Sequence, residues 1–247
     1  MNKAVAVLAL SGILVAGCLK TLDPNLVVGA GIDLAKSFSV SDSQMVALAN
    51  QSIGEMDGSS KVAGANDPYS IRLNRLFAKH KNSAQVPLDY KVYYDTTLNA
   101  FAMPNGSIRV HTGLMDLLND DELVGVIGHE IGHVVAEHSM ARYKSSYRTL
   151  AGQKIIASTG GTLGQLGASQ IGALSTQFLN SKFSRNNELE ADAYGVNLLK
   201  TNNHNPRALI TAFEKMRRVH GDGGGIFASH PSNSQRIAAI EALIAAN

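Results

Sequence analysis

The 247-residue sequence contains a single cysteine, no tryptophan and only 6 prolines. One cysteine excludes an internal disulfide and any zinc site built from cysteine thiolates. The sequence also has no large excess of positive or of negative charge, since it contains 22 Lys and Arg residues and 20 Asp and Glu residues. This balance indicates neither a nucleic-acid-binding surface nor a polybasic membrane surface. A hydrophobic content of 45% excludes a disordered chain, and the length leaves room for one domain with a full core.

The single cysteine, Cys18, follows a short apolar segment. Lys3 precedes an apolar run, residues 4–14, that is too short to cross a bilayer as a stable helix. Residues 1–17 are therefore typical of a signal peptide that is removed. The segment Leu14-Val15-Ala16-Gly17-Cys18 resembles a bacterial lipobox, which implies cleavage before Cys18 and lipidation of that residue. The alternative is an ordinary secretory signal with an incidental cysteine, or a buried thiol.

Lipidation of Cys18 would attach the protein to a membrane. The next residue is Leu19, not Asp, and by resemblance to Gram-negative sorting this favours the periplasmic face of the outer membrane. We expect residues 18–40 to form the lipidated N-terminus and a tether, and residues 41–247 to form the folded domain.

Apolar spacing in residues 41–247 predicts a mostly helical domain with one small sheet. Strand composition marks 90–94 and 107–111, and Asn105-Gly106 is a hairpin-type turn between 99–104 and the last strand. Helices are expected over residues 41–56, from Pro68 onward, and over 121–138, 183–199, 205–220 and 232–246. The Gly-rich stretch within 151–174 is expected to be a loose helical hairpin, and its residues 159–173 are a candidate lid.

The main candidates for metal binding and catalysis lie in the motif His129-Glu130-Ile131-Gly132-His133. Histidines at i and i+4 share one helix face, so both imidazoles can bind one metal ion. Glu130 is positioned to reach a water on that ion, where a general base belongs. Because apolar residues surround these three groups, leaving them buried without a partner would cost several kcal/mol. Two solvated surface histidines are the alternative interpretation.

A catalytic zinc site needs a third protein ligand. Glu188 and Asp192 lie four residues apart and hence on one helix face, whereas Glu190 points elsewhere. One of the two carboxylates can bind zinc while the other accepts a hydrogen bond from a ligand histidine. Gly128 and Gly132 would let another backbone or a substrate approach the histidine helix closely.

Together these motifs resemble the gluzincin peptidases of the CAAX prenyl protease and mitochondrial Oma type, in their bacterial lipoprotein branch. Four blocks carry the resemblance over residues 40–245: Asn99-Ala100-Phe101-Ala102 with Gly106, the His129–His133 motif, Glu188 with Asp192, and His230-Pro231 followed by Arg236. The resemblance implies an α+β, zincin-like fold whose edge strand faces the active-site cleft. It also implies one zinc ion held by His129, His133 and Glu188, with Glu130 as the base.

The same resemblance assigns further residues. Asp192 would accept a hydrogen bond from a ligand histidine, and Asn99, Ala100, Phe101, Ala102 and Met103 would form the strand that binds extended peptide by β-augmentation. His230 would steady the oxyanion or occupy the open zinc position, and Arg236 would pair with a carboxylate near the site. We expect no role for His80, His111, His138, His204 or His220.

The sequence therefore predicts a zinc metalloendopeptidase that is anchored as a lipoprotein and cleaves periplasmic or outer-membrane proteins. A non-catalytic chaperone or assembly factor on the same fold is the alternative, although it would have no need of Glu130. A zinc enzyme that cuts a non-peptide bond is a second alternative.

Overall fold

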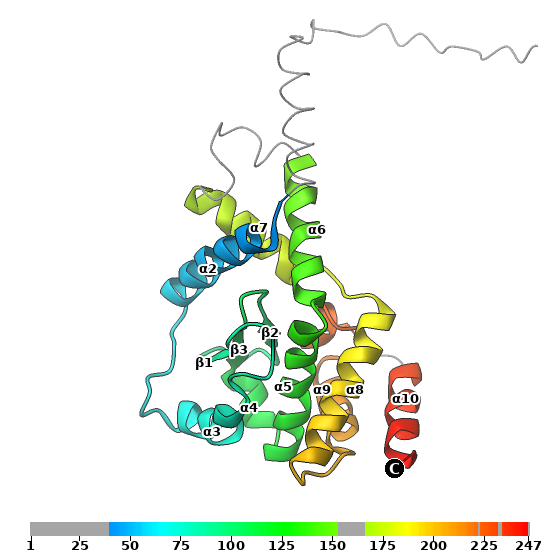
Figure 1. Cartoon of the computed structure of the whole chain (residues 1–247). Coiled ribbons are helices and arrows are strands. Elements are labelled where there is room, and N and C mark those ends of the chain that lie inside the picture. Colours follow the sequence, from blue (N-terminus) through cyan, green and yellow to red (C-terminus); the bar gives the residue numbers. More distant parts are fainter. Residues whose placement is uncertain (1–39, 153–165, 222, 232–233, 247) are drawn as a thin grey trace, which may run out of the picture.

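The computed structural model describes residues 40–152, 166–221, 223–231 and 234–246. The fold is mostly helical, with one three-stranded sheet beside the long central helix α5 (Figure 1). The helices and their bounds are α2 Asp42–Ser59, α3 Pro68–Phe77, α4 Thr112–Leu117, α5 Asp120–Val135, α6 His138–Gly152, α7 Ala168–Asn180, α8 Arg185–Thr201, α9 Ala208–His220 and α10 Ser234–Ala245. Two 3₁₀ turns, η1 Ala78–His80 and η3 Gly225–Ala228, complete the described elements.

The sheet is built from β1 (Asp89–Tyr93), β2 (Ala100–Ala102) and β3 (Ser107–His111), in the order β1-β3-β2. β1 runs parallel to β3, and β2 runs antiparallel to it through the turn that contains Gly106. Gly106 has φ +84, and a Cβ there would lie 2.3 Å from the carbonyl oxygen of Pro87, so only glycine fits this turn. The predicted small sheet and hairpin are confirmed, and β2 lies at an edge.

Several helix boundaries follow the expected capping residues. Ser41 caps α2 in a capping box with Gln44, and Pro68 is the first residue of α3 behind the cap Asp67. The predicted helix over 121–138 is wrong at its end. α5 stops at Val135, and Glu137 takes a left-handed φ of 58, so His138 begins a separate helix.

Two clusters of buried side chains form the core. The larger one surrounds α5 and joins it to the sheet, α8 and α9. The smaller one lies between α2, α6, α7 and the sheet, around residues such as Met45, Phe101 and Phe178. α5 is therefore covered on most sides, which explains why residues 122–134 are all buried although they include four ionisable side chains.

A charged group joins α2 to the sheet. The carboxylate of Asp57 accepts hydrogen bonds from Nε of Arg109 at 2.8 Å, Nζ of Lys91 at 2.7 Å and the hydroxyl of Tyr93 at 2.6 Å. Burial of Asp57 alone would raise its pKa, but these three partners lower the pKa to about 2.

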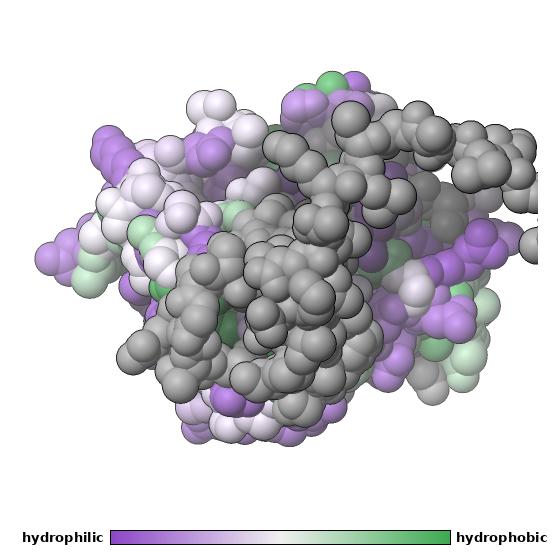
Figure 2. Space-filling model, turned by 90° about the horizontal axis from the view of Figure 1, so that it is seen from above, coloured by the Kyte–Doolittle hydropathy of each residue, from purple (hydrophilic) through white to green (hydrophobic). Residues whose placement is uncertain are grey.

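One face of the molecule shows mainly polar residues where the structure is described. On the face shown in Figure 2, the described residues are mostly hydrophilic, and hydrophobic residues are visible only in small areas. Among the described helices, none combines the length and apolarity needed to cross a membrane.

Candidate metal centre

Close packing between α5 and α8 builds the site. A Cβ on Gly128 would lie 2.9 Å from a Leu198 methyl, and one on Gly132 would lie 3.0 Å from Cα of Ala191. Gly195 of α8 approaches α5 in the same way, because its Cβ would lie 3.0 Å from the carbonyl oxygen of Gly125. The segment expected to approach Gly128 and Gly132 is thus α8. This contact sets the histidines of α5 beside the carboxylates of α8 (Figure 1).

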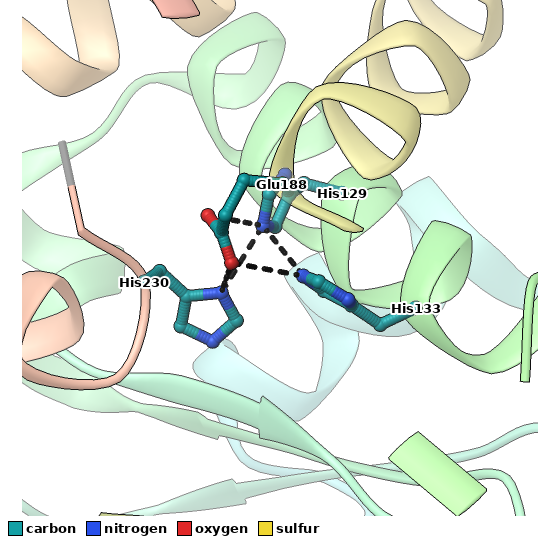
Figure 3. Close-up of side chains that lie close together, drawn as sticks. All are labelled: His129, His133, Glu188 and His230. Atoms are coloured by element: carbon teal, nitrogen blue, oxygen red, sulfur yellow. Dashed lines mark hydrogen bonds and ion pairs between the residues drawn. The ribbon is translucent and has the colours of Figure 1, made fainter. Parts of the chain in front are cut away.

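Four side chains from three segments converge on one point. His129 and His133 come from α5, Glu188 from α8, and His230 from the loop before α10 (Figure 3). One ligand atom from each lies within 4.8 Å of the others. Nε2 of His129 is 3.0 Å from Nε2 of His133 and 3.2 Å from Nδ1 of His230, which in turn is 3.2 Å from Oε1 of Glu188. Nε2 of His133 is 3.5 Å from the same Glu188 oxygen.

These distances fit a zinc ion. Zinc binds imidazole nitrogen and carboxylate oxygen at roughly 2.0–2.2 Å, so tetrahedral ligand atoms should lie about 3.4 Å apart. The four separations given above, 3.0 to 3.5 Å, lie around that value, and Nε2 of His129 is 3.7 Å from Oε2 of Glu188. Three nitrogens and one carboxylate oxygen also suit zinc better than Ca²⁺ or Mg²⁺, which prefer oxygen ligands. The residues present therefore fit the expected metal.

Asp192 orients the first histidine. Its Oδ1 lies 2.8 Å from Nδ1 of His129, so that nitrogen carries the proton and Nε2 faces the cluster with its lone pair. Arg236 holds the carboxylate in turn, donating from Nε at 2.7 Å and from Nη2 at 2.6 Å. Nη1 of Arg236 also lies 2.5 Å from Oε2 of Glu188. Asp192 and Arg236 thus lie beside the cluster and link His129 to Glu188.

His138 supports the second histidine, although the sequence analysis gave it no role. Nδ1 of His138 is 3.2 Å from Nδ1 of His133, and its Nε2 is 3.2 Å from Oε2 of Glu190. On a continuous helix His138 would face away from His133. The break at Glu137 turns the chain and brings the ring back. Glu190 itself lies outside the cluster, because its side chain is 66% exposed.

Glu130 lies beside the four candidate ligands. Its Oε1 is buried, makes no hydrogen bond with any described residue, and faces Nε2 of His230 at 3.4 Å. A buried carboxylate oxygen without a hydrogen bond is costly unless a ligand or water uses it. The position expected of a general base is therefore available next to the candidate metal ligands.

Burial and neighbouring charged groups shift the pKa values of the side chains in the cluster. Burial alone would lower the pKa of His129, but the hydrogen bond and charge of Asp192 raise that pKa above its usual value. Burial would raise the pKa of Glu188, yet the charge of His230 and hydrogen bonds from His133 and His230 hold it well below its usual range. Glu188 and Asp192 are therefore ionised at neutral pH.

An aromatic side chain that the sequence analysis missed covers the site. The ring of Phe183, between α7 and α8, stacks on His133 with centroids 3.7 Å apart and an interplanar angle of 15°. Its backbone N–H donates to the carbonyl of Ser229 at 3.2 Å, next to His230. All the candidate ligands, Glu130 and Asp192 are at most 2% exposed, so the structure shows the site closed.

The predicted peptide-binding strand lies next to α5. Asn99 and Met103 direct backbone groups to β3, because the carbonyl of Asn99 accepts from His111 and the N–H of Met103 donates to Ser107. Alternation in an antiparallel pair directs the backbone groups of Ala100 and Ala102 to the opposite side. Phe101 lies between them in register with Arg109. The strand therefore lies at an edge of the sheet, and its three residues are buried.

Two expectations lie outside the described residues. Cys18 and the signal peptide fall within 1–39, and the first part of the candidate lid, residues 159–165, falls within 153–165. The described remainder of the expected helical hairpin, from residue 168, belongs to α7.

Comparisons with known proteins agree with this geometry. Residues 70–244 match the family described as Peptidase family M48. The sequence is 38% identical to the metalloprotease YcaL of Escherichia coli (strain K12) over 250 residues, covering 99% of this chain and 98% of the relative. It is 39% identical to the metalloprotease LoiP of the same organism over 222 residues, covering 89% and 88%. The mitochondrial metalloendopeptidase OMA1 of Arabidopsis thaliana is 34% identical over 147 residues, which cover 59% of this chain and 29% of the relative.

The matched residues contain the whole histidine and carboxylate cluster, and the expected family is confirmed. Of the functions that the sequence left open, a peptidase is the one that this match supports. The chain belongs to peptidase family M48 and is a metallopeptidase with a zincin-like fold.

Proposed function

We propose that the protein is a zinc-dependent endopeptidase whose metal is held by His129, His133 and Glu188, with Glu130 as general base. The observation that carries the proposal is the convergence of these ligand atoms beside the buried Glu130 oxygen that makes no hydrogen bond. A zinc ion bound there would lower the pKa of a water molecule and polarise the carbonyl of the bond to be cut.

The chain's own groups supply the remaining steps. Glu130 would accept a proton from the attacking water and pass it to the amine that leaves, so no net proton is gained or lost by the enzyme. Asp192, held by Arg236, keeps the proton of His129 on Nδ1, and His138 lies against the corresponding nitrogen of His133. Both histidines would then offer Nε2 to the metal throughout the reaction.

The edge of β2 would hold the substrate. Backbone groups of Ala100 and Ala102 would pair with an extended peptide, which gives affinity with little demand on sequence. Such a substrate can enter only after the cover over the site moves, because Phe183 and His230 lie against the cluster. Of the two roles expected for His230, its position supports the one in which it occupies the open fourth metal position and restrains activity.

We also propose that the enzyme acts from a membrane. The lipobox-like segment that ends at Cys18 supports lipidation, and Leu19 after it favours the periplasmic face of the outer membrane. The substrates would then be periplasmic or outer-membrane proteins, consistent with a role in protein quality control in the cell envelope.

One experiment tests the enzymatic part. The purified mature chain is assayed for metal content by mass spectrometry and for cleavage of casein and quenched peptides, before and after a chelator. We expect one zinc per chain, loss of cleavage on chelation and recovery when zinc is restored. A chain that cleaves peptides equally well without metal, or that binds zinc and hydrolyses only non-peptide bonds, would contradict the proposal.

A further inference from the structure

A cavity lies on the outer side of Phe183, next to the candidate metal centre. Its volume is about 180 Å³, and its walls come from the start of α6, the segment 181–184 and the start of α8. Arg142, Lys182, Phe183 and His138 are among the lining residues, and the lining includes no Asp or Glu. The cavity therefore has positively charged walls and no acidic side chain to balance them.

Arg142 is the unusual residue in this lining. It is only 7% exposed, yet no described carboxylate lies within ion-pair distance of it, and its Nε is buried without a hydrogen-bond partner. Among the described residues, the guanidinium of Arg142 makes one hydrogen bond, from Nη1 to the carbonyl of Ser181 at 3.3 Å. Burial lowers the pKa of Arg142 to about 10, which leaves the guanidinium charged at neutral pH. Buried charges are ordinarily paired.

Aromatic rings hold the guanidinium in place, and the negative charges of Glu130 and Glu188 act on it from beyond ion-pair distance. Its central carbon lies 3.8 Å from the ring centroid of Phe183 and 4.1 Å from that of Phe178, which are cation–π distances. Lys182 adds a second positive charge at the exposed side of the cavity, and α8 begins at the cavity with the cap Ser184. The N-terminus of a helix also favours negative charge.

Phe183 connects the cavity to the metal centre. His133 covers one face of the Phe183 ring at 3.7 Å, so the guanidinium, at 3.8 Å from the same centroid, must lie over the other face. Arg142 and the candidate ligand His133 therefore lie on opposite faces of one ring, so a peptide bound at the ligands would bring a carboxylate to Arg142 around the edge of Phe183.

We propose that this cavity is a substrate subsite that binds a carboxylate of the peptide near the bond that is cut, with Arg142 as the residue that selects it. The inference rests on the proposed peptidase activity and adds a substrate class to it. The carboxylate can belong to an acidic side chain or to the C-terminus of the peptide, and the two sources share the same chemistry. A guanidinium binds either one through paired, charge-assisted hydrogen bonds.

The test uses paired peptides of one host sequence. A single Glu is moved through the three positions on each side of the cut bond in quenched, C-terminally amidated peptides, and each is compared with its Gln counterpart. A second arm uses peptides without acidic residues that end within three residues of the cut bond, as free acid or amide. Both arms are assayed with wild type, Arg142→Met and Arg142→Lys. The control is Arg185→Met, which changes an exposed arginine at the start of α8.

Wild type should prefer Glu over Gln at one position, or the free acid over the amide, by about tenfold or more in kcat/KM, mainly through KM. Arg142→Met should reduce that preference to less than about twofold, measured as the ratio of acidic to neutral peptide within the variant, whatever its rate on the neutral peptides. Arg142→Lys should keep part of the preference, and Arg185→Met should keep all of it. Equal cleavage of acidic and neutral peptides by wild type would overturn the proposal, as would an equal loss on both in Arg142→Met.

Failure of the subsite can be told apart from failure of the enzyme. Circular dichroism and metal content show whether Arg142→Met is folded, and the wild-type comparison needs no variant at all. If wild type cleaves none of the peptides, the proposed activity has failed. Fluorescence anisotropy of the labelled Glu and Gln peptides on wild type then tests the subsite alone, and equal affinities would overturn it.

Discussion

Nδ1 of His129 lies 2.8 Å from Oδ1 of Asp192, 63 residues further along the chain, and both groups are completely buried. This hydrogen bond places a proton of His129 on Nδ1 and directs Nε2 at Nε2 of His133, which lies 3.0 Å away. Arg236 donates to both oxygens of the same carboxylate, and its positive charge balances that of Asp192 inside the protein.

Loss of Asp192 should weaken metal binding without abolishing it. We expect Asp192→Ala to reduce zinc affinity roughly 10- to 100-fold, the usual effect of removing a group that orients a ligand histidine. Glu188→Ala should reduce it much further, because only the histidines would remain. Glu190→Ala is the matched control and should bind zinc as wild type does, since that side chain is largely exposed. Zinc titration of the three variants measures this, and an empty site in Glu190→Ala alone would contradict the assignment.

His138 should affect metal binding through His133. In His138→Ala the Nδ1 of His133 loses its neighbour at 3.2 Å, so the imidazole can rotate or change tautomer. We expect zinc affinity to fall about tenfold. His204→Ala is the control, because His204 pairs with Asp121 at the other end of α5 and contacts none of the candidate ligands. Unchanged zinc affinity in His138→Ala would show that His133 needs no support from this side.

The spacing within each helix was readable from the sequence, and the contacts between helices were not. His129 with His133 and Glu188 with Asp192 each lie four residues apart, so helical geometry alone puts each pair on one face. The sequence could not place His138, because Glu137 takes a left-handed conformation without a glycine or proline to mark the break. The stacking of Phe183 and Arg142 joins segments about 40 residues apart, and no local pattern encodes such a contact.

Acid should weaken the attachment of α2 to the sheet. The pKa of Asp57 is lowered to about 2 by Arg109, Lys91 and Tyr93, against 3.8 for the ordinary carboxyl. The stabilisation is therefore complete above pH 4 and is lost as the pH falls toward 2. Asp57→Asn should unfold at a lower urea concentration than wild type at pH 6. The difference between the two unfolding midpoints should become smaller below pH 4. Asp116→Asn, an exposed carboxylate, is the control. A gap that does not change with pH would contradict this account of Asp57.

Cys18 should carry the lipid. Cys18→Ser should give a soluble or unprocessed protein, because only a thiol at the cleavage site accepts the acyl chains that anchor it. Metabolic labelling with a radioactive fatty acid, followed by membrane fractionation, checks the prediction. Incorporation of label into the variant would disprove the lipobox interpretation, whereas the peptidase assignment would be unaffected.

The central claim is that Glu130 moves protons and does not hold the metal. In Glu130→Gln the side chain keeps its size but loses its basicity, so peptide hydrolysis should fall at least about 100-fold, the lower range for loss of a general base. The variant is purified beside wild type, and its zinc content and its kcat on one quenched peptide are measured on the same sample. The account predicts one zinc per chain together with the lost turnover, because His129, His133 and Glu188 remain. Zinc lost together with activity, or turnover unchanged with zinc bound, would contradict it.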